Sequence, residues 1–271
     1  MCKESSDEQR ATMPHTLLTV SHHMARVTLH SPPANALTHA VLKELEQVFI
    51  ELEADEYVRV VVLTGFDRFF SAGADVHELK HLHTKYSGSE FSTRGQACLN
   101  RIERLDKPVI AAINGVCFGG GLELAMACHI QIAAAGSSLG LPEISFGVIP
   151  GFGGTQRLTR MIGLSKAAEL ILTGERVTAE EALRMGLVSR VVPLEGLLKE
   201  AETLAGAIAA RGRVATRAAL RAIRGGCDRP LSEGLVRESE LFGELCETPD
   251  KNEGIQSFLE KRLPHFADTD P

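Results

Sequence analysis

The segment that decides the fold reads Asn114-Gly115-Val116-Cys117-Phe118-Gly119-Gly120-Gly121-Leu122-Glu123. A short apolar run over residues 109–113 precedes it and predicts a buried strand, and residues 122–128 predict a helix. Three glycines therefore end a loop where a helix begins. At such a position, free backbone amides and the helix dipole stabilise developing negative charge. The segment predicts an oxyanion-binding turn between a strand and a helix.

A dinucleotide-binding turn is the main alternative for this segment, because glycine-rich turns after strands also hold pyrophosphate. The glycine spacing does not reproduce GxGxxG, and no acidic residue ends a following strand where it would contact a ribose. The sequence therefore disfavours a nucleotide cofactor.

The chain before this segment alternates between strands and helices. Residues 16–20 and 25–30 predict a hairpin, residues 38–54 an amphipathic helix, and residues 58–63 a strand that is buried on both faces. Small residues then follow in Phe70-Ser71-Ala72-Gly73-Ala74-Asp75-Val76, where a ligand can approach the backbone closely. We interpret the polar residues 80–94 as a mobile flap. The alternation predicts an α/β fold.

The carboxyl third of the chain is almost wholly helical in its pattern. The predicted helices cover residues 156–162, 166–172, 179–185, 194–210, 214–224 and 231–246. We expect a disordered extension over residues 1–13, an α/β core over residues 14–200, and a helical region over residues 201–271 that belongs to the same functional unit.

Composition limits the classes of protein that the chain can represent. With 271 residues, 44% of them hydrophobic, it can bury a substantial core, and its formal charge of −6 gives no basic surface for nucleic acid. Its six cysteines include no CxxC pair, which disfavours a zinc site and fits reduced thiols. The first ten residues lack the apolar centre of a signal peptide, and no apolar run reaches the roughly 18 residues of a membrane span. We expect a cytoplasmic protein without a nucleic-acid or membrane partner.

Two glutamates are the candidate acids and bases. Glu123 lies in the first turn of the predicted helix, and Glu143 follows twenty residues later, after another apolar strand near residues 130–135. Their small and apolar neighbours favour burial, which raises the pKa of a carboxyl group. Two carboxyl groups in unequal environments can divide acid and base roles. The glycine-rich residues 147–155 then predict turn amides that fix a water near Glu143.

Three of these segments together resemble the signature segments of the crotonase, or enoyl-CoA hydratase/isomerase, superfamily: residues 70–76, 114–123 and 142–157. All three segments match those of the superfamily in order and in spacing. Residues 35–37 and 252–266 extend the similarity over nearly the whole chain. The resemblance implies a spiral of ββα units followed by helices that form a trimer, with two trimers stacked as a hexamer.

The resemblance also implies roles for single residues. The amides of Ala74 and Gly120 would bind the thioester oxygen, Glu143 would deliver a proton to the α-carbon, and Glu123 would activate a water to which Gly151 donates its amide. The substrate would be an acyl-CoA thioester, so that no separate cofactor is expected. No metal is expected either, because His77, His81 and His83 have no nearby cysteine or properly spaced carboxylate. The residues that would contact coenzyme A are Ala34, Ala72, Ala74, Asp75, Val76, His77, Gly120, Phe258 and Lys261. His77 stands where many members of the family carry lysine, and His129 where an aspartate is common.

The pair of glutamates favours an enoyl-CoA hydratase that adds water syn across the 2,3 double bond of a 2-enoyl-CoA. The alternatives are a Δ3,Δ2-enoyl-CoA isomerase or another acyl-CoA enzyme of the superfamily, and a non-catalytic relative that binds RNA. The sequence does not select the length or branching of the acyl chain.

Overall fold

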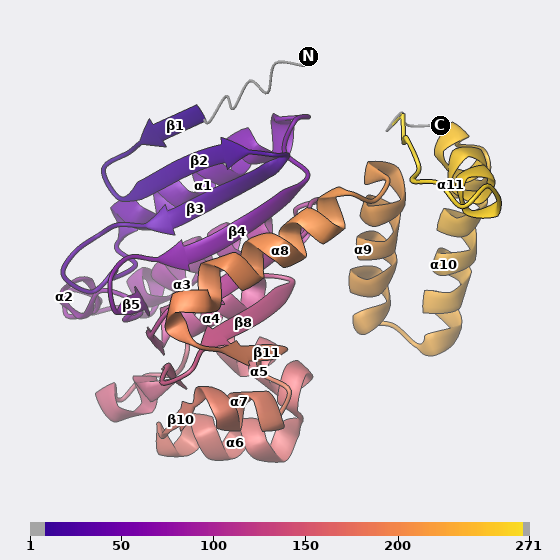
Figure 1. The fold of residues 1–271 in the computed structure, drawn as a ribbon. Helices are drawn as coiled ribbons and strands as arrows, with labels where there is room; N and C mark the ends of the chain where they lie inside the picture. Colours follow the sequence, from indigo (N-terminus) through magenta and orange to yellow (C-terminus); the bar gives the residue numbers. More distant parts are fainter. Residues whose placement is uncertain (1–8, 268–271) are drawn as a thin grey trace. The chain divides into compact units, whose positions relative to one another are not determined.

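The computed structural model describes residues 9–267, which form two compact units with the boundary between Ala205 and Gly206 (Figure 1). The predicted α/β class is confirmed in the first unit and the predicted helices in the second. Residues 9–12 form strand β1, so this part of the expected disordered extension is wrong, and residues 1–8 lie outside the described residues.

The first unit contains two sheets. The larger has seven strands in the order β1 (Gln9–Thr12), β2 (Thr16–Ser21), β3 (Met24–Leu29), β4 (Val60–Gly65), β6 (Val109–Ile113), β8 (Ile130–Ala134) and β11 (Arg190–Val192). The smaller has four, in the order β10 (Arg176–Thr178), β9 (Ser138–Gly140), β7 (Val116–Phe118) and β5 (Phe69–Ser71). Strands β3 to β11 of the larger sheet are parallel neighbours, whereas β1, β2 and β3 pair antiparallel.

The chain runs through these sheets as a spiral of ββα units, as expected. The pairs β4–β5, β6–β7 and β8–β9 each place one strand in the larger sheet and the next in the smaller. The helical segments that follow these pairs are α2 (Val76–Leu79) with α3 (Lys85–Arg104), α4 (Gly120–Ala127), and the 3-10 helix η1 (Pro142–Phe146) with α5 (Gly154–Ile162). Each unit therefore brings a strand end and a helix start to the same region.

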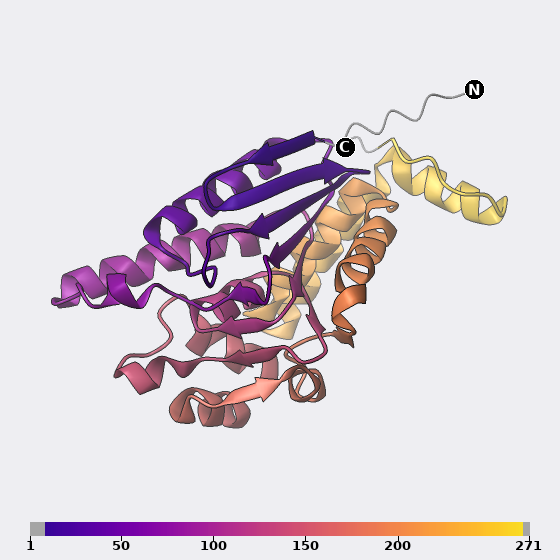
Figure 2. The same ribbon diagram turned by 60° about the vertical axis from the view of Figure 1, so that its left-hand side comes forward.

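Continuous apolar runs produce the central strands because helices cover both faces of the larger sheet. The side chains of β4 from Val60 to Leu63 and all of β6 are fully buried. Helix α1 (His39–Ala54) packs with α3 on one side (Figure 2). Helix α8 (Leu197–Ala209), which follows the 3-10 helix η2 (Leu194–Gly196), crosses the other side, where Arg26 of β3 pairs with Glu202 at 2.9 Å. Thr38 caps α1 as a side-chain acceptor for the amide of Val41.

The remaining helices complete the two units. Helices α6 (Leu164–Thr173) and α7 (Ala179–Arg184) belong to the first unit. The second unit contains α9 (Arg213–Cys227), α10 (Leu231–Cys246) and α11 (Pro249–Leu259). Within residues 9–267, every helix is too short or too polar to cross a membrane.

Helix α3 replaces most of the expected mobile flap. It begins at Lys85 and is opened by a capping box, in which Thr84 Oγ1 accepts from Ser87 N and Ser87 Oγ accepts from Thr84 N. Its buried positions include Gly95, which lies against the ring of Phe152, itself only 1% exposed. The flap interpretation is therefore wrong for the residues from Lys85 onward.

The contact at Gly95 predicts a measurable packing cost. A Cβ at this position would lie 2.1 Å from Phe152 Cδ1. We expect Gly95→Ala to lower the free energy of unfolding by about 1–3 kcal/mol, as overpacked cores do. Gly88 on the same helix meets nothing within 4 Å, so Gly88→Ala should instead raise it, by up to about 1 kcal/mol. Urea unfolding of both variants checks this, and equal effects would contradict the packing argument.

Candidate active site

Two backbone amides from separate units of the spiral lie close together. Ala74 follows β5, and Gly120 is the first residue of α4. A Cβ on Gly120 would lie 3.2 Å from Ala74 N, and a Cβ on Gly73 would lie 3.2 Å from Gly120 N. The two predicted oxyanion residues are thus brought together, and side chains at either glycine would fill the space between them.

The local backbone leaves both amides available to a ligand. Gly120 opens its helix, so its amide has no acceptor within that helix. Among residues 9–267, Ala74 N donates no hydrogen bond. Hydrogen bonds hold the backbone just before Ala74 in place, because Leu37 N donates to Gly73 O at 2.8 Å and Gly73 N donates to Ser71 Oγ at 3.2 Å. Gly73 has a φ of +102°, which a residue with a Cβ rarely adopts.

Glu123 is buried in α4 and is held by the turn before α5. Its side chain is 1% exposed, and Oε1 accepts from Phe152 N at 2.8 Å and from Gly154 N at 2.6 Å. Burial and, to a smaller extent, the charge of Glu143 raise the pKa of Glu123 to about 8, against the opposing effect of the two amides and of the charge of Arg157. Among the described residues, Glu123 Oε2 accepts no hydrogen bond, so this oxygen can face a ligand or water.

Glu143 lies in the first turn of η1 beside the glycine turn. Its Oε1 would be 2.7 Å from a Cβ on Gly119, which shows how closely the carboxyl group approaches that backbone. Its Oε2 is buried and has no hydrogen-bond partner within residues 9–267. Burial raises the pKa of Glu143 to about 7. Because Glu143 acts on the pKa of Glu123, the structure brings both predicted acids into one electrostatic site.

The raised pKa of Glu123 predicts a dependence of stability on pH. Its value in the unfolded chain is near 4.5 and in the folded chain about 8, so the folded state prefers the protonated acid. That preference stabilises the fold fully below the unfolded value and is lost as the pH rises through the folded value. We expect the stability of the parent to fall relative to Glu123→Gln between pH 5 and pH 8 in urea unfolding. A difference that stays constant across this range would contradict the pKa shift; exposed Glu175→Gln controls for the substitution.

The residues expected around coenzyme A lie in more than one place. Ala72 N donates to Ala34 O at 3.0 Å, so these two segments meet beside Ala74. Asp75 caps α2 and accepts from His77 N at 2.8 Å, and the side chain of Val76 is exposed. The structure thus gathers this part of the expected set at one edge of the first unit.

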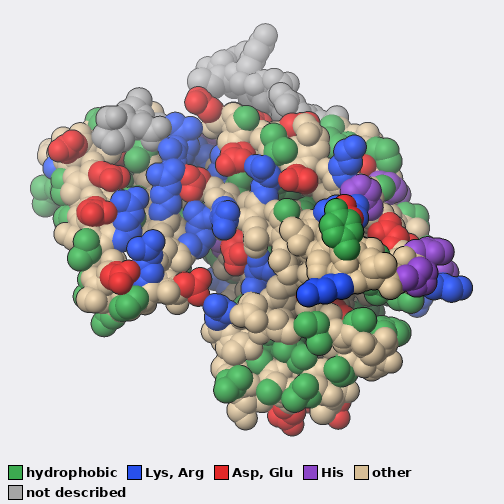
Figure 3. Space-filling view, turned by 180° about the vertical axis from the view of Figure 1, so that it is seen from behind, with side chains coloured by type: hydrophobic (Ala, Val, Ile, Leu, Met, Phe, Trp, Pro, Cys, Tyr) green, Lys and Arg blue, Asp and Glu red, His purple; other side chains and the backbone are tan. Residues whose placement is uncertain are grey.

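Phe258 and Lys261 belong to the second unit, in α11 and just after it. The side chain of Phe258 is 81% exposed. Histidine side chains gather on the face that Figure 3 shows, yet the described part of the chain contains no cluster of three or more potential metal ligands. The role of Phe258 and Lys261 in binding the ligand stays a prediction.

Gly151 presents its carbonyl to α3, where it accepts from Ser92 Oγ and Gln96 Nε2. The amides that hold Glu123 are those of Phe152 and Gly154, which the sequence did not single out. The glycine-rich pattern of residues 147–155 marked the turn, but the direction of each amide depends on its three-dimensional course. A water contact of Gly151 stays a prediction.

Comparison with known proteins gives the family. The model of the enoyl-CoA hydratase/isomerase family matches residues 19–269. The chain belongs to this family. The probable enoyl-CoA hydratase of Bacillus subtilis is 45% identical over 250 residues, which cover 92% of this chain and 97% of that protein. The short-chain-enoyl-CoA hydratase of Clostridium acetobutylicum is 43% identical and is similar over 88% of this chain and 92% of that protein.

The family member also shares its fold with solved hydratases. The crystal structure of enoyl-CoA hydratase from Bacillus anthracis superposes with a TM-score of 0.88 at 38% identity, over 97% of this chain and 100% of that one. The crotonase-like fold predicted from the three glycine segments is thereby confirmed.

His129 is the residue that stands where an aspartate is common in the family. Its Nδ1 accepts from Val109 N at 2.9 Å and its Nε2 contacts Glu103 O, so it connects β6 to α3.

Proposed function

We propose that the chain is an enoyl-CoA hydratase that adds water syn across the 2,3 double bond of a 2-enoyl-CoA thioester. The observation that carries the proposal is the pair of carboxyl groups of the buried Glu123 and the half-buried Glu143, each with a raised pKa, beside the amides of Ala74 and Gly120. An isomerase that shuttles one proton needs only one such acid. The curated hydratases that resemble this chain over most of its length support the same activity.

The geometry suggests how each group acts. The thioester oxygen accepts from the amides of Ala74 and Gly120, which stabilise the negative charge as the enolate forms. Glu123, fixed through Oε1, takes a proton from water through Oε2 while the water oxygen bonds to the β-carbon. Protonated Glu143 then gives its proton to the α-carbon. The two added groups arrive from the side of the ligand on which both acids lie, which is a syn addition.

Self-association is part of the proposal. The second unit exposes large apolar side chains on all three of its helices: Ile223, Leu231, Leu235, Val236, Phe242, Ile255, Phe258 and Leu259. Such a set of exposed apolar residues is typical of an interface. We expect a homotrimer or a dimer of trimers, which the mass measured by light scattering would show.

A cytoplasmic location fits the described thiols. Cys98, Cys117 and Cys128 are buried and free, and burial raises the pKa of Cys98 to about 12. Protonated, buried thiols of this kind are stable in a reducing compartment.

The activity is tested with two substrates of opposite optical change. Hydration of crotonyl-CoA removes the absorbance of the conjugated thioester, whereas isomerisation of a 3-enoyl-CoA creates it. We expect rapid loss with crotonyl-CoA and a much slower gain with 3-hexenoyl-CoA, and the double variant Glu123→Gln, Glu143→Gln should do neither. Rapid isomerisation without hydration would favour the isomerase. If the protein catalysed neither reaction but bound RNA with a steep dependence on salt, the non-catalytic alternative would be favoured.

A further inference from the structure

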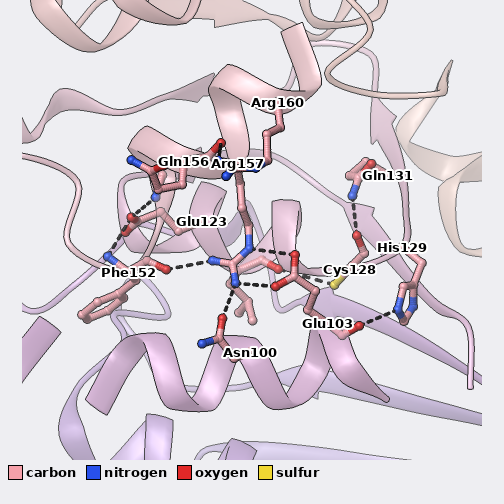
Figure 4. A network of polar contacts seen from close by, with 12 residues as sticks. Asn100, Glu103, Glu123, Cys128, His129, Gln131, Phe152, Gln156, Arg157 and Arg160 are labelled. Atoms are coloured by element: carbon pink, nitrogen blue, oxygen red, sulfur yellow. Dashed lines mark hydrogen bonds and ion pairs between the residues drawn. The ribbon is translucent and has the colours of Figure 1, made fainter. Parts of the chain in front are cut away.

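The turn that holds Glu123 is itself fastened to α3. Gly151 O accepts from Ser92 Oγ and from Gln96 Nε2 at 2.9 Å, both on α3. The next carbonyl, Phe152 O, accepts from Arg157 Nη1 at 2.9 Å (Figure 4). Two consecutive carbonyl groups of the turn are therefore fixed by side chains, while the amide of Phe152 points the other way, to Glu123.

Arg157 is in turn fixed by α3. Its guanidinium donates to Glu103 through Nε at 3.2 Å and Nη2 at 2.7 Å, and Nη2 also donates to Asn100 Oδ1 at 2.7 Å (Figure 4). The side chain is only 11% exposed, so these bonds are largely shielded from water. The planar group thus binds a carboxylate with two nitrogens and keeps the third, Nη1, for the carbonyl of Phe152.

The side chains of α3 that take part share one face of the helix. Ser92, Gln96, Asn100 and Glu103 recur at intervals of three and four residues. The ring of Phe152 fills the remaining space on this face, against Gly95 on one side and within 3.2 Å of a Cβ position at Gly120 on the other. The peptide of Phe152 is therefore restrained by its ring, its carbonyl and its amide together.

We propose that Arg157, fastened by Asn100 and Glu103, is a positioning residue that orients the Phe152 peptide so that Glu123 Oε1 is held and Oε2 faces the reacting water. The proposal rests on the hydratase function proposed above. Within residues 9–267, Arg157 donates no hydrogen bond to Glu123. It acts on this residue through the Phe152 peptide and through its positive charge, which lowers the pKa of Glu123 and which Arg157→Lys preserves. The fold provides no second donor to Phe152 O within residues 9–267, so this carbonyl depends on Arg157.

Arg157→Lys tests the proposal because lysine keeps the charge but cannot bind Glu103, Asn100 and Phe152 O at once. We expect kcat for crotonyl-CoA to fall by about 10- to 100-fold with KM nearly unchanged, since a misplaced catalytic group lowers the rate by this order. Arg160→Lys is the matched control on the same helix, because Arg160 Nη1 donates to the backbone and side-chain oxygens of Gln156 within α5. It should leave kcat unchanged.

Two further readouts separate positioning from a merely structural role. In a Glu123→Gln background, Arg157→Lys should cause little additional loss, because the residue through which it acts is already disabled. The amide of Phe152 lowers the pKa of Glu123, so weakening this hydrogen bond should raise that pKa. In Arg157→Lys, the acidic limb of the plot of kcat against pH should therefore move to higher pH. Equal losses in both backgrounds, or a uniform fall at all pH values, would overturn the proposal.

Asn100→Ala provides a second variant if Arg157→Lys does not fold. It removes one of the acceptors of Arg157 and should reproduce the same changes at smaller size. A parent that fails to hydrate crotonyl-CoA refutes the proposed function, whereas an active parent whose kcat is insensitive to both variants refutes only the positioning role.

Discussion

Glu123→Gln and Glu143→Gln are each expected to lower kcat for the hydration of crotonyl-CoA by about 10²–10⁴-fold, the usual contribution of a positioned acid or base. Glutamine preserves the size of each side chain and can still accept the amides of Phe152 and Gly154 through its carbonyl oxygen. It cannot take a proton from water at position 123 or give one to the α-carbon at position 143. The steady-state rate at which the absorbance of the conjugated thioester disappears measures kcat for both variants.

The two losses have to occur together for the hydratase account to hold. Exposed Glu175→Gln is the matched control and should retain full activity. Retention of hydration by either site variant would show that one carboxyl group suffices for hydration and would contradict the mechanism with two acids. Unfolding in urea shows whether the variants still fold.

Gly119→Ala is expected to lower kcat by about 100-fold or more, the scale for small displacements of a catalytic group. A Cβ at this position would lie 2.7 Å from Glu143 Oε1, so the carboxyl group has to move. Gly119 also has a φ of +50°, which costs an L-residue about 1–2 kcal/mol. The variant should therefore lose both activity and stability.

Gly136 supplies the control that separates these two effects. It has a φ of +83°, and a Cβ there meets nothing within 4 Å. Gly136→Ala should lose stability in urea unfolding while its kcat stays that of the parent. If Gly119→Ala lost stability but kept its kcat, the close approach of Glu143 to the glycine turn would have no catalytic consequence.

The sequence predicted the parts of the fold whose signal is local. The strands predicted over residues 58–63 and 109–113 correspond to β4 (Val60–Gly65) and β6 (Val109–Ile113), and Thr38, the first residue of the predicted helix over residues 38–54, caps α1. The resemblance of three linked glycine segments supplied the spiral, which periodicity alone could not. These predictions succeed because buried parallel strands and helix caps depend on neighbouring residues.

Helix α3 was missed for a physical reason. Its buried side consists largely of Gly95, Cys98, Leu99 and Ile102, near its end, so the first half shows no apolar stripe. The capping pair of Thr84 and Ser87 was the signal that the sequence offered. The polar residues of this helix are not a solvated flap, since four of them hold the active-site turn or its arginine.

The site was predictable in its reactive groups but not in its supports. The two glutamates and the segments of Ala74 and Gly120 follow from residue type and resemblance. The partners of Glu123 could not be read from the sequence, because it does not show which amides of the glycine-rich turn point to the carboxyl group; in the structure these are the amides of Phe152 and Gly154. Arg157 lies inside a recognised segment, yet its function depends on Glu103, which is distant in the chain.

A crystal structure with the unreactive analogue butyryl-CoA tests the central claim most directly. The account predicts a thioester oxygen at about 2.7–3.1 Å from both Ala74 N and Gly120 N, the range for oxyanion donors. It also predicts the β-carbon beside Glu123 Oε2 and the α-carbon beside Glu143 Oε2. A bound thioester whose oxygen contacts only one of these amides, or whose α- and β-carbons lie away from both glutamates, would contradict it.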